Sequence, residues 1–142
     1  MKLTGKNVVV TGGGTGIGAG IAQAVAREGC RVAIGGRREE KLRAVADAWT
    51  GAGAILAHSL DVANRDSVAE FFTWAAKELG EIHVLVNAAG MNIRTRTMAT
   101  MTPEQWDQVM AVNATGAFNC MHSVLPQMRE RRDGLVINIS SV

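Results

Sequence analysis

The sequence predicts an α/β fold, a doubly wound Rossmann-type parallel sheet with helices on both faces. Short apolar runs rich in Val and Ile alternate strictly with longer segments whose apolar residues recur at helical spacing. The run Asn7–Thr11 breaks into the glycines of Gly12–Gly18 and reopens as an alanine-rich stretch, which is typical of a strand, a phosphate-binding turn and a helix. Apolar strands joined by helices favour a parallel sheet. No helix follows the fifth strand, so the predicted fold is truncated after it.

Each element is predicted from its apolar spacing and its end signals. The five strands are expected at Asn7–Thr11, Arg31–Ile34, Ala54–His58, Ile82–Val86 and Gly134–Ser140. The helices are expected at Ile17–Glu28, Glu39–Trp49, Arg65–Leu79 and Thr102–Arg131.

Helix faces and ends follow from the same residues. The first helix is expected to place Ile17, Ile21 and Val25 on one side and to stop at Gly29. Asn64 is the expected cap of the third helix. Thr102 and Gln105 form a predicted capping box, with Pro103 at the first helical position. The second helix is expected to place Leu42, Val45 and Trp49 on one side. The side chains of the third helix that are expected to point inward are Val68, Phe71, Phe72, Ala75 and Leu79.

Bulk composition limits the classes of protein that fit. The chain has 142 residues, 47% of them apolar, so residues 1–142 are expected to form one domain, or an incomplete one. A net charge of +2 is too small to argue for nucleic acid or membrane binding. No segment approaches about eighteen uninterrupted apolar residues, and no signal peptide is visible, so we expect a soluble cytoplasmic protein. Cys30 and Cys120 lack metal-ligand spacing and are expected to be buried thiols.

The glycine-rich turn predicts a dinucleotide site. Gly12-x-x-x-Gly16-x-Gly18 lets a ligand approach the backbone, and the following helix turns its positive end towards a pyrophosphate. The alternative is a plain structural turn. The residues expected to bind the cofactor here are Gly12, Gly14, Thr15, Gly16, Ile17 and Gly18.

Two arginines replace the acidic residue that usually follows the second strand and binds the adenosine ribose. Arg37 and Arg38 precede a helix whose dipole they oppose, and an anion between them would relieve that conflict. A 2′-phosphate is such an anion, so NADP(H) is preferred as cofactor and NAD(H) is possible. The alternative is that both arginines pair with Glu39 and Glu40 in solvent.

Further candidate residues follow the third and fourth strands, because ligands in such folds bind at the carboxyl ends of strands. Asp61 and Val62 close the third strand, and the fourth ends in the small residues that let a flat cofactor approach. These are Asn87, Ala88, Ala89 and Gly90. Alternatively, Asp61 terminates a loop and Asn87 satisfies amides at the strand end.

The longest helix carries a polar residue on a face that is otherwise apolar. Asn113 lies near Val109, Ala117 and Cys120, and Gly116 follows it. This setting suggests a local distortion of the helix that holds water. Ser140 and Ser141 end the fifth strand, where a hydroxyl could bond a substrate carbonyl or serve in a turn.

Together these motifs resemble the classical short-chain dehydrogenase/reductase family. The motifs that carry the resemblance are Thr11-Gly12-x-x-x-Gly16-Ile17-Gly18, Asp61-Val62, Asn87-Ala88-Ala89-Gly90, Asn113 and Ile137-Asn138-Ile139-Ser140-Ser141. The resemblance implies hydride transfer between NADP(H) and a carbonyl or alcohol, with Asn113 holding a water of the proton relay and Ser141 polarising the substrate oxygen. One departure is Ala88, where the family usually carries another Asn.

The family's Tyr-x-x-x-Lys segment is missing. The chain contains no Tyr and no Lys after Lys77. General acid-base help is typically worth about 10²–10⁴ in rate, so this chain alone is expected to be inactive. We therefore expect part of an NADP-dependent oxidoreductase. The alternatives are a non-catalytic nucleotide-binding or interaction module and a methyltransferase of similar topology.

The resemblance also implies partners. The family's helix that corresponds to Thr102–Arg131 packs against a second subunit, so a homodimer or homotetramer is expected, and Met110, Phe118, Met121 and Leu125 are the residues concerned. Alternatively they pack only on their own sheet. Arg94 and Arg96 could contact an anionic substrate or remain solvated.

Overall fold

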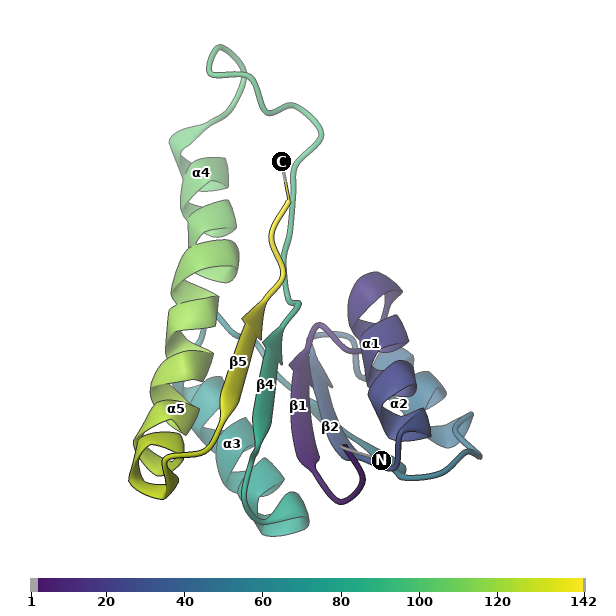
Figure 1. Ribbon diagram of the computed structural model, residues 1–142. Helices are drawn as coiled ribbons and strands as arrows, with labels where there is room; N and C mark the ends of the chain where they lie inside the picture. Colours follow the sequence, from purple (N-terminus) through teal and green to yellow (C-terminus); the bar gives the residue numbers. More distant parts are fainter. Residues whose placement is uncertain (1–2, 142) are drawn as a thin grey trace.

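The computed structural model describes residues 3–141, and it confirms the predicted parallel sheet (Figure 1). The strands are β1 (Asn7–Thr11), β2 (Arg31–Gly36), β3 (Ala54–Ser59), β4 (Val84–Asn87) and β5 (Leu135–Asn138). The helices are α1 (Gly16–Arg27), α2 (Glu39–Asp47), α3 (Arg65–Leu79), α4 (Pro103–Met110), the π-helical turn η1 (Ala111–Thr115) and α5 (Gly116–Arg131). Strand bounds differ from the predicted ones by up to two residues. Helix α2 stops short of Trp49, whose indole N–H donates to the carbonyl of Ala52 in the next loop.

The strand order β3-β2-β1-β4-β5 places β1 in the middle of the sheet. The chain runs outwards from β1 to β3 and then returns to pair β4 with the other side of β1, with Val8 facing Val32 on one side and Val84 on the other. The order in which the chain adds strands to the sheet therefore changes direction between β1 and β4, although all the strands are parallel. In open parallel sheets, this switch point is where ligands bind, outside the carboxyl ends of the strands.

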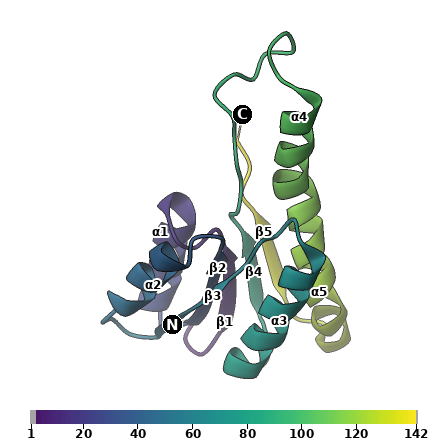
Figure 2. The same cartoon turned by 180° about the vertical axis from the view of Figure 1, so that it is seen from behind.

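Helices cover both faces of the sheet, as predicted (Figures 1 and 2). Alternate side chains of β1 enter different layers, because successive residues of a strand point to opposite faces. Val8 and Val10 pack with α1 and α2, whereas Val9 packs with α3 and α5. The predicted inward residues of α3 are all buried.

The side of α1 that carries Ile17, Ile21 and Val25 is not its most buried side. Ile21 and Val25 are only partly buried, and Ile17 is 66% exposed. The buried residues are Gly18, Ala22 and Ala26. Small side chains face the sheet because the helix begins directly against the turn after β1, where no room exists for an isoleucine.

The predicted N-terminal caps of α3 and α4 are confirmed. The Asn64 side chain accepts a hydrogen bond from the backbone N–H of Ser67 at 3.0 Å, which caps α3. Thr102 and Gln105 exchange side-chain to backbone hydrogen bonds, so the capping box of α4 is complete. These local signals depend on residues three positions apart, which explains why the sequence alone is sufficient to predict them.

The predicted long helix is interrupted by η1, which confirms the expected distortion near Asn113. A π-helical turn holds one more residue than an α-helical turn. Gly116 follows it at a tight contact, since a Cβ atom there would lie 2.5 Å from Cγ2 of Val62. The run α4–η1–α5 therefore passes close to the loop after β3.

Both cysteines are buried, as predicted. Burial raises the pKa of the Cys120 thiol to about 12. Burial, and then the charge of Glu28, raise the pKa of the Cys30 thiol. Both groups are therefore protonated near neutral pH and pack as small apolar side chains.

Several large apolar side chains remain exposed in two places. On the outer side of α4–α5 these are Trp106, Met110, Phe118 and Leu125, whereas Met121 packs against the core. On β5 and the residue after it they are Leu135, Ile137 and Ile139, which are 40–53% exposed. Among residues 3–141, no helix has the length and apolarity needed to cross a membrane.

Candidate functional site

A cleft of about 600 Å³ lies at the carboxyl ends of the strands, at the predicted switch point. Every residue predicted to bind the cofactor lines this cleft except Asn87. The lining residues that were not predicted are Gly36, Lys41, Leu42, Leu60 and Val112. Of these, Lys41 could have been inferred, since it lies one helical turn beyond the paired arginines. Val112 comes from η1, so only the folded structure brings it to the cleft.

The floor of the cleft is bare backbone. Gly12 has a φ of +66°, and a Cβ atom there would lie 2.8 Å from Cα of Ala89 in the loop after β4. At Gly18 a Cβ atom would lie 2.7 Å from the carbonyl carbon of Gly12 and closer still to its oxygen. Glycine is thus required at both positions, because the turn packs between α1 and the β4 loop with no space for a side chain.

The first turn of α1 opens into the cleft. Its N-cap residue Thr15 makes no side-chain capping bond, and the first turn carries no acidic residue. Its backbone N–H groups are therefore left for another acceptor. An anion at this position would be stabilised by these groups and by the helix dipole.

Three cations stand at the β2 side of the cleft, namely Arg37, Arg38 and Lys41. The predicted alternative, pairing with Glu39 and Glu40, is not what the structure holds. Glu39 instead pairs with Arg43 one helical turn later, at 2.8 Å. Within residues 3–141, neither Arg37 nor Arg38 makes an ion pair or a side-chain hydrogen bond. Both guanidinium groups therefore remain free for an anionic ligand.

The loop after β3 is held by its own hydrogen bonds. The Asp61 carboxylate accepts from the backbone N–H of Ala63 at 3.0 Å, and the Asp61 N–H donates to Oγ of Ser67 at 2.9 Å. The predicted turn role of Asp61 is therefore present. Because Asp61 and Val62 also line the cleft, the same turn shapes the wall of the site.

Asn87 is the predicted cofactor-binding residue that does not line the cleft. It is 6% exposed, and its amide donates to Oδ1 of Asn138 on β5 at 2.9 Å. A neighbouring residue, Thr11, holds the loop that lines the cleft. Its buried hydroxyl accepts a hydrogen bond from the backbone N–H of Ala89 at 3.1 Å. Asn87 ends a central strand, so its side chain turns towards the next strand and away from the ligand space.

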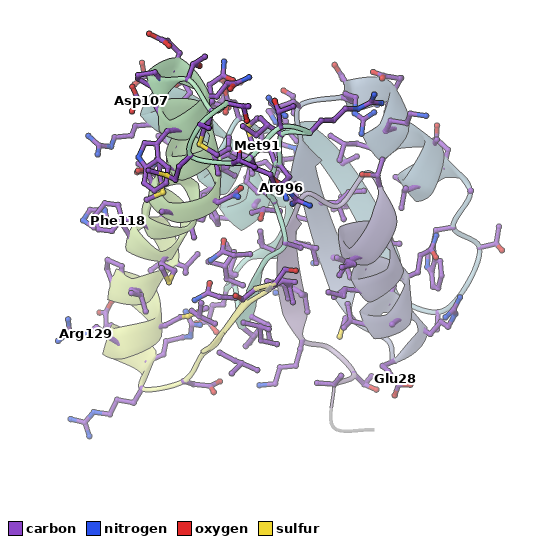
Figure 3. All side chains as sticks on the ribbon, turned by 90° about the horizontal axis from the view of Figure 1, so that it is seen from above. Glu28, Met91, Arg96, Asp107, Phe118 and Arg129 are labelled. Carbon is purple, nitrogen blue, oxygen red and sulfur yellow. The ribbon has the colours of Figure 1, made fainter. Side chains whose placement is uncertain are left out.

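Asn113 lies in η1 and is exposed. Its amide makes two hydrogen bonds of 2.8 Å with one residue of the loop after β4. The Oδ1 atom accepts from the N–H of Met91, and Nδ2 donates to the Met91 carbonyl. Seen from above, Met91 and Arg96 lie together over the middle of the molecule, between the α5 side and the α1 side (Figure 3). Asn113 thus fastens this loop beside Gly90 of the cleft.

Ser141 follows β5 and is exposed. The segment 139–141 continues beside the segment that follows β4 (Figures 1 and 2), and the N–H of Ile139 donates to the Asn87 carbonyl at 3.0 Å. The structure therefore brings the segment that carries Ser141 alongside the loop fastened by Asn113. Neither Asn113 nor Ser141 lines the cleft itself.

Comparison with known proteins agrees with this arrangement. A family model described as short chain dehydrogenase matches residues 6–142. An uncharacterized oxidoreductase of Mycobacterium bovis is 39% identical over 140 residues, which cover 99% of this chain and 56% of that protein. A 3-oxoacyl-(acyl-carrier-protein) reductase of Staphylococcus aureus is 38% identical over 144 residues, covering 100% of this chain and 58% of the relative.

A solved structure is also similar. It is a metagenomic short-chain oxidoreductase in complex with NADP, which superposes with a TM-score of 0.91 at 36% identity. The match covers 100% of this chain and 65% of that one. This chain spans 56% and 58% of the lengths of the two curated relatives described above.

Proposed function

This chain belongs to the short-chain dehydrogenase family, and on that premise we propose that it is the cofactor-binding part of an NADP-dependent oxidoreductase. The proposed reaction is hydride transfer between NADP(H) and a carbonyl or alcohol group of a small-molecule substrate. The single observation that carries the proposal is the combination, in one cleft, of a side-chain-free glycine floor and two unpaired arginines.

The residues of the cleft fit a dinucleotide. The floor at Gly12 and Gly18 admits backbone contact, and the open N-terminus of α1 suits the pyrophosphate. Arg37 and Arg38 suit the 2′-phosphate, because guanidinium groups bind phosphate through paired N–H donors. When bound, the nicotinamide supplies or accepts the hydride. The remaining contributions belong to the protein.

Two further residues are proposed for the chemical step. Asn113 holds the Met91 backbone and so sets the position of the loop after β4 next to the reacting groups. Ser141 is proposed to donate a hydrogen bond to the substrate oxygen. Because the chain contains no Tyr and no Lys after Lys77, we propose that this chain alone does not catalyse the proton transfer.

Cofactor titration tests the proposal. We expect saturable binding of NADPH at one site, measured by calorimetry, with a lower Kd than for NADH. Adenosine 2′,5′-bisphosphate should compete, since it carries the phosphate that the arginines recognise. Absence of binding for both dinucleotides would contradict the proposal, and tighter binding of NADH would contradict its NADP preference.

We also propose that the protein is a homo-oligomer assembled through α4–α5. The exposed apolar side chains of that surface support it, since contiguous apolar patches mark association sites. Phe118 points outward from α5 (Figure 3). Light scattering should give at least twice the monomer mass, and Phe118→Asp should shift the protein towards the monomer. A wild-type monomer at micromolar concentration would contradict this part of the proposal.

A further inference from the structure

A buried amide connects α5 to the wall of the cleft. Asn119 is 5% exposed, and its Nδ2 atom donates to the carbonyl of Val62 at 2.9 Å in a buried hydrogen bond. Its Oδ1 atom accepts from Nε of Arg65 at 3.3 Å. Both ends of the amide are therefore satisfied by the loop after β3 and the first residue of α3, 54–57 residues away in the sequence.

The partner of this amide belongs to the site. Val62 lines the cleft together with Leu60 and Asp61. Its side chain also packs against the position of Gly116, where a Cβ atom would lie 2.5 Å from Cγ2. The Val62 segment is thus held by its backbone at Asn119 and by its side chain at Gly116. A carbonyl at this depth loses a partner that water does not replace if the amide is removed.

The same helical run holds the opposite wall. Asn113 in η1 binds both backbone groups of Met91, next to Gly90 of the cleft. Asn119, six positions later, binds the β3 loop. One rigid helical element thus fixes two loops that border the cleft. Asn113 lies within η1 and Asn119 lies in α5, so the wider π-helical turn changes the direction of one side chain relative to the other.

We propose that Asn119 is a positioning residue for the dinucleotide: it fastens the Val62 loop to α5 and so keeps the wall of the cleft in its binding-ready position. This inference rests on the proposed function. A loop that is already ordered in the free protein loses little conformational entropy when the ligand binds, and the affinity is higher for that reason. Asn119 contacts no ligand itself, so its effect is on the Kd of the cofactor and not on which phosphate is recognised.

The experiment compares variants of the same helix in the intact protein. Asn119→Leu removes both hydrogen bonds and keeps the number and branching of the side-chain heavy atoms. Asn119→Asp keeps the oxygen used by Arg65 and loses the donor to Val62. Val124→Ala is the matched control, because it shortens a side chain of α5 that is 2% exposed, lies in the core and does not line the cleft. Each variant is measured for its Tm and its Kd for NADPH.

We expect both Asn119 variants to raise the Kd for NADPH by roughly five- to tenfold. This factor corresponds to the lower end of the free-energy cost of leaving a buried polar group without its hydrogen-bond partner. The ratio of the NADPH and NADH affinities should not change. Val124→Ala should lower Tm and leave the Kd within a factor of two. Equal Kd values for wild type and Asn119→Asp, or equal Kd shifts in Asn119→Leu and Val124→Ala, would overturn the inference. Failure of the wild type to bind NADPH would instead overturn the proposed function.

Discussion

Replacing Gly18 by Ala is expected to disrupt the glycine turn and to cause a large loss of cofactor binding. The new Cβ atom would lie 2.7 Å from the carbonyl carbon of Gly12, so either α1 or the turn must move. Overpacking of this kind costs about 1–3 kcal/mol of stability. Movement of the α1 N-terminus also misplaces the amides proposed to hold the pyrophosphate. A loss of about 2–3 kcal/mol in binding corresponds to a Kd for NADPH that is roughly 30–150-fold higher.

Gly20 provides the matched control, because it lies on the same helix two residues later. A Cβ atom at Gly20 meets no atom within 4 Å. Gly20→Ala should therefore raise the free energy of unfolding by about 0.5–1 kcal/mol, the usual gain for this change within a helix. Urea denaturation and NADPH titration of both variants test the pair. Equal affinities for wild type and Gly18→Ala would show that the turn does not hold the cofactor.

Replacing Arg37 and Arg38 together by Ser is expected to remove most of the preference for NADPH over NADH. A charge-assisted hydrogen bond contributes about 1.5–3 kcal/mol, and exposure places both arginines at the lower end of this range. At about 1.4 kcal/mol for each factor of ten, the Kd for NADPH should rise roughly tenfold for each arginine. The Kd for NADH, which lacks the 2′-phosphate, should change little. Added salt should weaken NADPH binding in the wild type and have less effect in the variant.

Arg43→Ala is the control for this pair. Arg43 has the same charge and lies on α2, but it is engaged by Glu39 and does not line the cleft. Its removal should leave both Kd values within about a factor of two, since surface pairs contribute little. If the double variant weakens NADPH and NADH equally, the arginines do not recognise the 2′-phosphate.

Local sequence patterns were sufficient to predict most of the fold. The turn after β1, the Asn64 cap and the Thr102 capping box depend on residues a few positions apart, and the structure confirms the two caps. The buried side of α3 follows from helical periodicity, because its apolar residues are large and its polar ones clearly separate. In α1 the apolar spacing does not identify the buried side, because Ile17 is exposed and the small residues Gly18, Ala22 and Ala26 are buried.

The roles of the asparagines could not be predicted in the same way. Asn87, Asn113 and Asn119 are each polar residues near apolar ones, and periodicity does not distinguish them. The Asn87 side chain forms a hydrogen bond with Asn138, 51 residues away. The Asn113 side chain bonds Met91, 22 residues away, and the Asn119 side chain bonds Val62, 57 residues away. An amide can donate and accept in any element, so its partner is decided only by which backbone groups the packing leaves nearby.

By itself, the sequence determined the order of strands and helices, the parallel sheet and the glycine turn, because these depend on local apolarity, periodicity and backbone freedom. Only the tertiary structure decided that Arg37 and Arg38 line one cleft with the glycine turn and the loop after β4, and that α5 holds the Val62 loop through Asn119. The physical reason is distance. A hydrogen bond or an ion pair requires two groups within a few ångströms, and folding sets that separation by packing elements that are far apart along the chain.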